Sequence, residues 1–135
     1  MSDVTVVDHP LATQDHAVQF GKAQGRGGMG AGAEGEAGIE KQISDIATAA
    51  ARAREAGYDG VEVMGSEGYF LNQFLSLRTN RREDRWGGAY ENRMRLPVEV
   101  VRRVRAAVGD DFIVIYRISM IDLVPGGSSW PEVAP

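Results

Sequence analysis

Two β-rich stretches decide the fold of this chain: GVEVM at residues 60–64 and FIVIYRI at residues 112–118. Both are rich in valine, isoleucine or aromatic side chains, which favour strands. Between them valines recur at three- and four-residue spacing: Val98, Val101, Val104 and Val108. That spacing predicts an amphipathic helix, which Gly109 ends. The order strand, helix, strand is that of a βαβ unit, whose strands run parallel.

A second helical stripe precedes this unit, and a short helix follows its first strand. The stripe consists of Ile39, Ile43, Ile46, Ala50 and Ala53, and Gly57 ends it. The short amphipathic helix is predicted over residues 69–77. The fold class is therefore α/β, and residues 39–135 form its regular part.

The segment before residue 39 is predicted to be irregular. Residues 25–38 read GRGGMGAGAEGEAG, with seven glycines in fourteen positions. Such a density of glycine costs too much backbone entropy for a helix or a strand. Val4, Val6 and Val7 predict a short strand further upstream, which His9-Pro10 would end. We therefore divide the chain into a flexible segment, 1–38, and a folded part, 39–135.

Composition excludes several classes of function. The net charge of −4 argues against nucleic-acid and membrane-surface partners. The chain has no cysteine, which excludes disulfides and thiolate metal sites within it and fits a cytoplasmic location. No signal peptide and no membrane span are expected. His9 and His16 lack neighbouring ligands, so we expect no metal site.

Chemistry is expected where the two strands end. In parallel α/β folds, ligands bind beyond the carboxyl ends of the strands. The loop Gly65–Tyr69 follows the first strand, and Arg117 lies near the end of the second. A carboxylate at Glu67, a phenol at Tyr69 and a guanidinium would then converge, a combination that suits binding and protonating a carbonyl-containing ligand.

Residues 58–119 carry several ordered motifs. The pattern N-x-R-x-D-x-[WY]-G-G occurs at residues 80–88, and E-N-R-x-R follows at residues 91–95. With MGSEGY at residues 64–69, these motifs resemble the Old Yellow Enzyme-type NADH:flavin oxidoreductase family, and within it the bacterial 2,4-dienoyl-CoA reductases. The resemblance covers about residues 39–129 and implies a partial (β/α)₈ TIM barrel, since a full barrel needs about 250 residues.

The resemblance also implies a cofactor and roles for three residues. The cofactor is FMN, reduced by NADPH or NADH. Tyr69 matches the family's proton-donating tyrosine, Glu67 an active-site acid, and Arg117 an arginine that contacts the flavin. The implied reaction is reduction of a conjugated C=C bond in a 2,4-dienoyl-CoA of fatty acid metabolism or in an enone. The family's iron–sulfur cluster has no ligands in this chain, and residues 1–38 resemble none of its strands.

Several alternatives stay open. One is a non-catalytic barrel remnant that associates with a partner or with itself through open sheet edges. Another uses Glu62 and Glu67 as a carboxylate pair, although such pairs usually come from separate strands. The glycines at 25, 27 and 30 fit a dinucleotide-binding pattern, but a poor helix start follows them. We expect the arginine-rich segment 78–95 to be a structural network that pins the loop.

Overall fold

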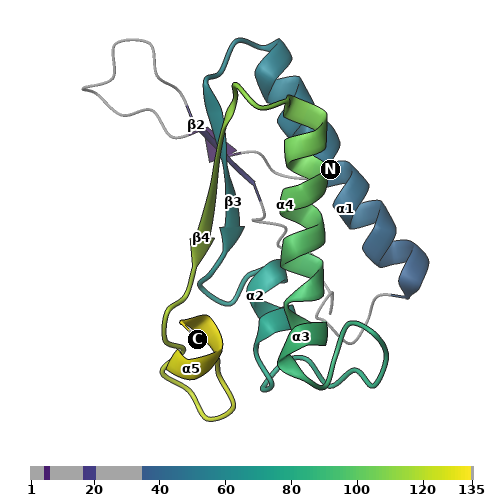
Figure 1. Ribbon diagram of the computed structural model, residues 1–135, viewed down its shortest axis with the longest axis vertical. Coiled ribbons are helices and arrows are strands. Elements are labelled where there is room, and N and C mark those ends of the chain that lie inside the picture. Colours follow the sequence, from purple (N-terminus) through teal and green to yellow (C-terminus); the bar gives the residue numbers. More distant parts are fainter. Residues whose placement is uncertain (1–4, 7–16, 21–34, 135) are drawn as a thin grey trace.

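A four-stranded sheet organises the molecule, with the strand order β1-β2-β3-β4 (Figure 1). The computed structural model describes residues 5–6, 17–20 and 35–134. The strands are β1 (Thr5–Val6), β2 (Ala17–Phe20), β3 (Gly60–Gly65) and β4 (Ile113–Ile118). β3 is parallel to both β2 and β4, whereas β1 is antiparallel to β2. The predicted parallel pairing of the two β-rich stretches is therefore confirmed.

Helices cover one face of this sheet. The two long ones, α1 (Glu36–Glu55) and α4 (Arg95–Val108), lie side by side against it (Figure 1). The shorter helices are α2 (Phe70–Leu75), α3 (Tyr90–Arg93) and α5 (Trp130–Val133). All three lie toward the carboxyl ends of β3 and β4. None of the helices in the described part of the chain is long and apolar enough to cross a membrane.

The alternation of side chains along the strands separates the core from an uncovered face. Val61 and Val63 are buried with the helix residues, while Glu62 between them is partly exposed. On β4, Tyr116 packs against the core, whereas Ile113 is 57% and Ile115 46% exposed. Successive side chains of a strand point to opposite faces. Among the described residues, the face that bears Ile113 and Ile115 has no helix over it.

α1 begins earlier than expected. The apolar stripe predicted a helix from residue 39, but α1 includes Glu36, Ala37 and Gly38. The Trp86 indole N–H donates to the Glu36 carboxylate at 2.9 Å, and Arg85 forms an ion pair with it. These contacts join positions about fifty residues apart, so local sequence cannot report them. They hold the first turn in place despite the glycines around it.

The sheet also continues into the segment expected to be irregular. β2 pairs with β3 in the register Ala17 to Gly60 through Phe20 to Val63. β1 lies inside the stretch of valines that predicted a short strand. The dinucleotide-like glycines, residues 25–30, and both histidines lie outside the described residues.

The arginine-rich segment is a structural network, as expected. Asn80 is buried, and its amide donates to the carbonyls of Phe74 and Trp86, both at 2.7 Å. Arg93 is also buried; it donates to the Gly88 carbonyl at 3.0 Å, to that of Leu75, and to a carboxylate on α5. These bonds satisfy loop carbonyls that would otherwise be buried without partners. The motif residues therefore fix the loop that supports the ends of β3 and β4.

Candidate functional site

The loop after β3 reverses the chain through two left-handed residues. Glu67 has φ 61° and Gly68 has φ 75°. Glycine adopts this conformation without penalty, but a glutamate pays roughly 1–2 kcal/mol for it. Strained non-glycine residues concentrate at functional sites. The backbone thus marks Glu67, independently of any motif, as a residue worth testing.

Three side chains that the sequence did not single out hold this loop. The Glu67 N–H donates to the Ser119 hydroxyl at 3.2 Å, which joins the loop to the segment after β4. The Gly68 N–H donates to the Asn72 amide oxygen at 2.7 Å, and Gln73 donates to the Gly68 carbonyl at 2.8 Å. Asn72 and Gln73 lie on α2. Their position four and five residues after Gly68 is the one feature of the sequence that could have pointed to these contacts.

Tyr69 is the residue immediately before α2. Its N–H donates to the Ser66 carbonyl at 3.2 Å, and its carbonyl accepts from the Gln73 N–H at 2.9 Å. The side chain is partly exposed. The backbone N–H and C=O of Tyr69 are therefore both hydrogen-bonded, which fixes the position from which the phenol extends at the carboxyl end of β3.

Arg117 is paired with an acid on the neighbouring strand. Its Nε and Nη2 donate to the two Glu62 carboxylate oxygens at 3.0 and 2.9 Å. These hydrogen bonds raise the pKa of the Arg117 guanidinium, because they stabilise its charged form. Both side chains lie on the helix-free face. Side chains alternate between the two faces of a strand, so the spacing of Glu62 and Arg117 along their two paired strands could have predicted this ion pair.

A cavity of about 430 Å³ opens beside the loop. The loop after β3, α2 and the segment after β4 line it, with Glu67, Asn72 and Asp122 among the polar residues. Tyr69 and Arg117 are outside this lining. The structure thus brings all three predicted residues to the same edge of the sheet, but only Glu67 into the cavity.

Tyr116 is a further tyrosine near the site, and it has a different character. Its hydroxyl oxygen is buried and has no hydrogen-bond partner among the described residues. Burial raises the pKa of this phenol far above its usual value. The hydroxyl lies against the backbone of Gly65, so only a residue without a side chain fits there. Tyr116 is a packing residue at the base of the loop.

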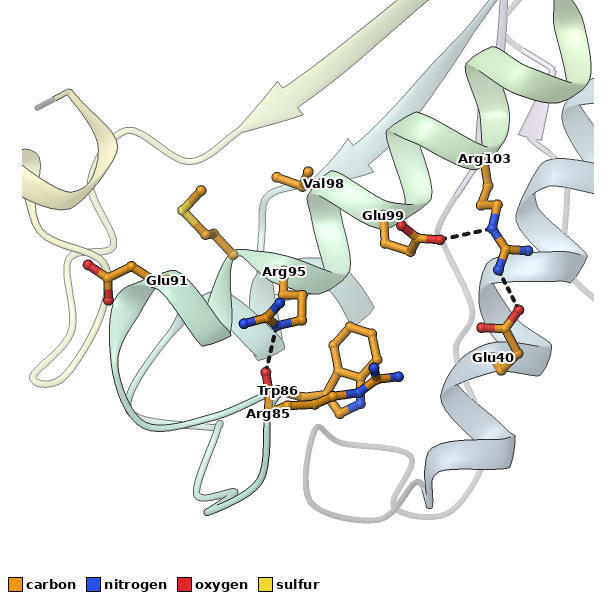
Figure 2. A pocket seen from close by; sticks show the side chains of 9 residues that line it. Glu40, Arg85, Trp86, Glu91, Arg95, Val98, Glu99 and Arg103 are labelled. Atoms are coloured by element: carbon orange, nitrogen blue, oxygen red, sulfur yellow. Dashed lines mark hydrogen bonds and ion pairs between the residues drawn. The ribbon is translucent and has the colours of Figure 1, made fainter.

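A second cavity, of about 540 Å³, lies on the helix side (Figure 2). Arg103 reaches from α4 to Glu99 and to Glu40 on α1, both at 2.8 Å. Arg95 donates to the Arg85 carbonyl at 3.0 Å. The charges in this cavity neutralise one another, which is typical of a solvated, self-paired surface. Neither here nor at any other place in the described part of the chain do three or more His, Asp or Glu side chains form a group that could hold a metal ion.

Comparison with known proteins identifies the family. The NADH:flavin oxidoreductase / NADH oxidase family model matches residues 16–134. The resemblance was expected to begin near residue 39, but the match begins 23 residues earlier (39 − 16) and takes in β2. The likeness therefore includes the strand that pairs with β3 on the side away from β4.

Individual relatives agree with this match. The NADH oxidase of Thermoanaerobacter brockii is 46% identical over 94 residues, which are 70% of this chain and 14% of that protein. The structure of a 2-naphthoyl-CoA reductase with 2-naphthoyl-CoA is 41% identical with a TM-score of 0.69, covering 70% of this chain and 14% of that one. Morphinone reductase in complex with tetrahydroNAD is 38% identical with a TM-score of 0.65, over 72% and 26% of the two chains.

The chain spans about a quarter or less of the length of these three proteins. The match nevertheless includes β3 and β4, the segment between them and the arginine-rich motif. The chain belongs to the NADH:flavin oxidoreductase / NADH oxidase family, the family of the Old Yellow Enzymes.

Proposed function

We propose that this chain forms part of the FMN site of an NAD(P)H-dependent oxidoreductase that reduces a conjugated C=C bond. The observation that carries the proposal is the shared position of Glu67, Tyr69 and Arg117 at the carboxyl ends of two paired parallel strands. Ligands of parallel α/β folds bind at this edge. In this proposal β2, β3 and β4 are consecutive strands of a (β/α)₈ barrel.

The residues present fit an FMN group. Reduced flavin carries negative charge on its ring, and a fixed cation nearby stabilises it. Arg117 supplies such a cation on the helix-free face, where its side chain is 48% exposed. A guanidinium has five N–H donors. Two of them bond Glu62, which leaves donors for a further acceptor while the ion pair keeps the side chain in place.

Protonation is the part of the reaction that this chain would perform. Bound reduced FMN would supply a hydride to one carbon of the conjugated bond. A tyrosine phenol, with an ordinary pKa of about 10, still carries its proton at neutral pH and can protonate the other carbon. Tyr69 is placed for this role by its two backbone hydrogen bonds. Glu67, in its strained loop, would orient the carbonyl end of the substrate or relay protons.

The proposed substrate is a 2,4-dienoyl-CoA or an enone. The motif MGSEGY at residues 64–69 supports the thioester. So does the likeness to a 2-naphthoyl-CoA reductase in complex with 2-naphthoyl-CoA. The likeness to morphinone reductase with a bound tetrahydroNAD supports a nicotinamide as the reductant.

The first experiment is the visible absorbance spectrum of the purified chain after incubation with FMN and removal of free cofactor. A retained flavin band, shifted from that of free FMN, is expected. Arg117→Gln should weaken retention, because it removes the cation and leaves Glu62 without its partner. Arg81→Gln is the matched control: this arginine is exposed and lies outside the site.

A second measurement separates binding from chemistry. In flavin-loaded protein, Tyr69→Phe should leave the flavin band unchanged and lower the rate of enone reduction by about 10²–10⁴-fold, the usual contribution of a positioned acid. A colourless wild-type chain would refute the claim that this chain holds FMN, while leaving its family membership untouched. Equal reduction rates in Tyr69→Phe and wild type would refute the role of the phenol.

A further inference from the structure

The cavity beside the loop after β3 is a slot with two walls. One wall is formed by residues within the range 67–79, and the other by residues within the range 119–124. In the first wall Gly68, Asn72 and Ser76 follow one another at four-residue spacing, so the slot runs along one face of α2 for the whole length of that helix. Its volume of about 430 Å³ lies in the range of about 300–1,000 Å³ that is usual for ligand pockets.

Hydrogen bonds join the two walls along the slot. Three residues of the first wall donate to residues that lie 52, 50 and 50 positions later in the sequence: Glu67 to Ser119, Asn72 to Asp122, and Ser76 to Gly126. Because these separations are nearly constant, the two segments run side by side in the same direction. The slot is therefore held together at both of its ends and in its middle.

The two ends of the slot differ in charge. Glu67 lies at one end, two residues before Tyr69, the proposed proton donor. Arg78 lies at the other end, where its backbone N–H donates to the Gly126 carbonyl at 2.7 Å. The Arg78 side chain is exposed and has no hydrogen bond or ion pair with any residue in the ranges 5–6, 17–20 and 35–134. A guanidinium whose donors are all available is a binding group for an anion, and especially for a phosphate.

Between these ends the slot offers hydrogen-bond acceptors and an apolar surface. Gln73 donates through its amide nitrogen to the Gly68 carbonyl, and its amide oxygen has no partner among the described residues. Asp122 accepts through Oδ2, and its Oδ1 is likewise without a partner in that part of the chain. Three apolar side chains complete the second wall: Ile121, Leu123 and Val124. A matching ligand has N–H donors and aliphatic carbons in its middle and a negative charge at one end.

We propose that the slot binds the arm of a coenzyme A thioester, with the thioester at Glu67 and the phosphates at Arg78. This inference rests on the proposed function and narrows its substrate from a thioester or an enone to the thioester. The pantetheine arm of coenzyme A is an aliphatic chain interrupted by amide groups, whose N–H donors match the acceptors on Gln73 and Asp122. A small enone would leave Arg78 without a ligand. A nicotinamide dinucleotide carries phosphates in its middle, where the Asp122 carboxylate would repel them.

The test is a calorimetric titration of the purified chain with free coenzyme A, without FMN. Wild-type protein should bind it, and Arg78→Gln should raise the dissociation constant by about tenfold, because a charge-assisted bond to phosphate is lost. Arg81→Gln is the matched control, because this arginine is also exposed but lies outside the slot; it should leave the constant unchanged. Pantetheine, which has no phosphate, should bind equally to the wild type and to Arg78→Gln.

A second variant tests the apolar wall. Leu123 is 92% exposed, so Leu123→Asp should not disturb the fold, but it places a charge in the slot and should weaken coenzyme A and pantetheine alike. The proposal is overturned if coenzyme A does not bind, if Arg78→Gln binds it as tightly as the wild type, or if NADH or inorganic pyrophosphate displaces it at equal concentration.

This experiment and the flavin experiment fail separately. A chain that retains FMN but does not bind coenzyme A would keep the proposed flavin site, with an enone as its substrate, and would contradict the slot. A chain that binds coenzyme A as expected but stays colourless would support the slot and refute the claim that this chain holds FMN.

Discussion

At Gly65 the backbone of the loop after β3 lies directly against the Tyr116 side chain, and replacing this glycine tests whether that contact is required. A Cβ atom at this position would overlap the ring and hydroxyl of Tyr116 and would lie 2.8 Å from the Arg117 carbonyl oxygen. Tyr116 cannot easily move, because its ring packs against the core and its hydroxyl is buried. Overpacking of this kind costs about 1–3 kcal/mol. We therefore expect Gly65→Ala to lower the free energy of unfolding by that amount.

A double-mutant cycle identifies the cause. Tyr116→Phe removes a buried hydroxyl that has no hydrogen-bond partner within residues 5–6, 17–20 and 35–134, so alone it should be neutral or stabilise by up to about 1 kcal/mol. In that background the added methyl group no longer meets the hydroxyl, although it still meets the ring. The cost of Gly65→Ala should therefore fall by at least about 0.5 kcal/mol, the size at which coupling is resolved. Urea denaturation followed by circular dichroism measures each corner of the cycle.

Gly68→Ala is the matched control for this cycle. Gly68 has φ 75° and nothing near its missing Cβ, so its replacement introduces backbone strain without a clash. It should cost about 1–2 kcal/mol equally in both backgrounds. The reasoning is refuted if Gly65→Ala costs less than about 0.5 kcal/mol, or the same with Tyr116 as with Phe at that position.

Three further predictions concern the loop network and one surface carboxylate. Asn80→Ala leaves two buried loop carbonyls without donors and should cost about 2–3 kcal/mol of unfolding free energy in urea, whereas a cost below about 1 would show that the loop closes without it. Arg93→Lys keeps the charge but loses the planar donor set, so it should lower the melting temperature by several degrees, and an unchanged value would contradict a structural role. The pKa of Glu99 is lowered from 4.5 to about 2, chiefly by the hydrogen bond from Arg102 and also by Arg103. A carboxyl with a depressed folded pKa stabilises the fold above pH 4.5 and loses that effect as the pH falls toward about 2. Glu99→Gln should therefore lower the urea midpoint at pH 6 more than at pH 3, and an equal loss at both would contradict the pairing.

Local patterns were sufficient for the regular elements of this chain. Runs of β-branched residues predicted β3 and β4, and valine spacing predicted α4 with its end at Gly109. Parallel pairing followed from the order of these elements, because a helical crossover returns the chain in the same direction. The position of Glu67, Tyr69 and Arg117 at one edge followed from the same argument.

Local patterns failed where contacts join distant segments. The start of α1 depends on Trp86 and Arg85, about fifty residues away, so an apolar stripe could not locate it. β2 is four residues long and is defined by its pairing with β3, which no local signal in a weakly patterned segment reveals. In both places a long-range partner stabilises backbone that would not hold its structure alone.

The sequence by itself therefore determined the kind of fold, the family and the edge of the sheet where chemistry belongs, since periodicity and motif spacing are local properties. Only the tertiary structure decided that Arg117 bonds Glu62 rather than projecting alone, that Tyr116 closes on Gly65, and that Ile115 is exposed on the helix-free face. Each of these depends on the register between β3 and β4. Strand register is set by the packing of whole faces, and a shift of one residue would send every side chain to the opposite face.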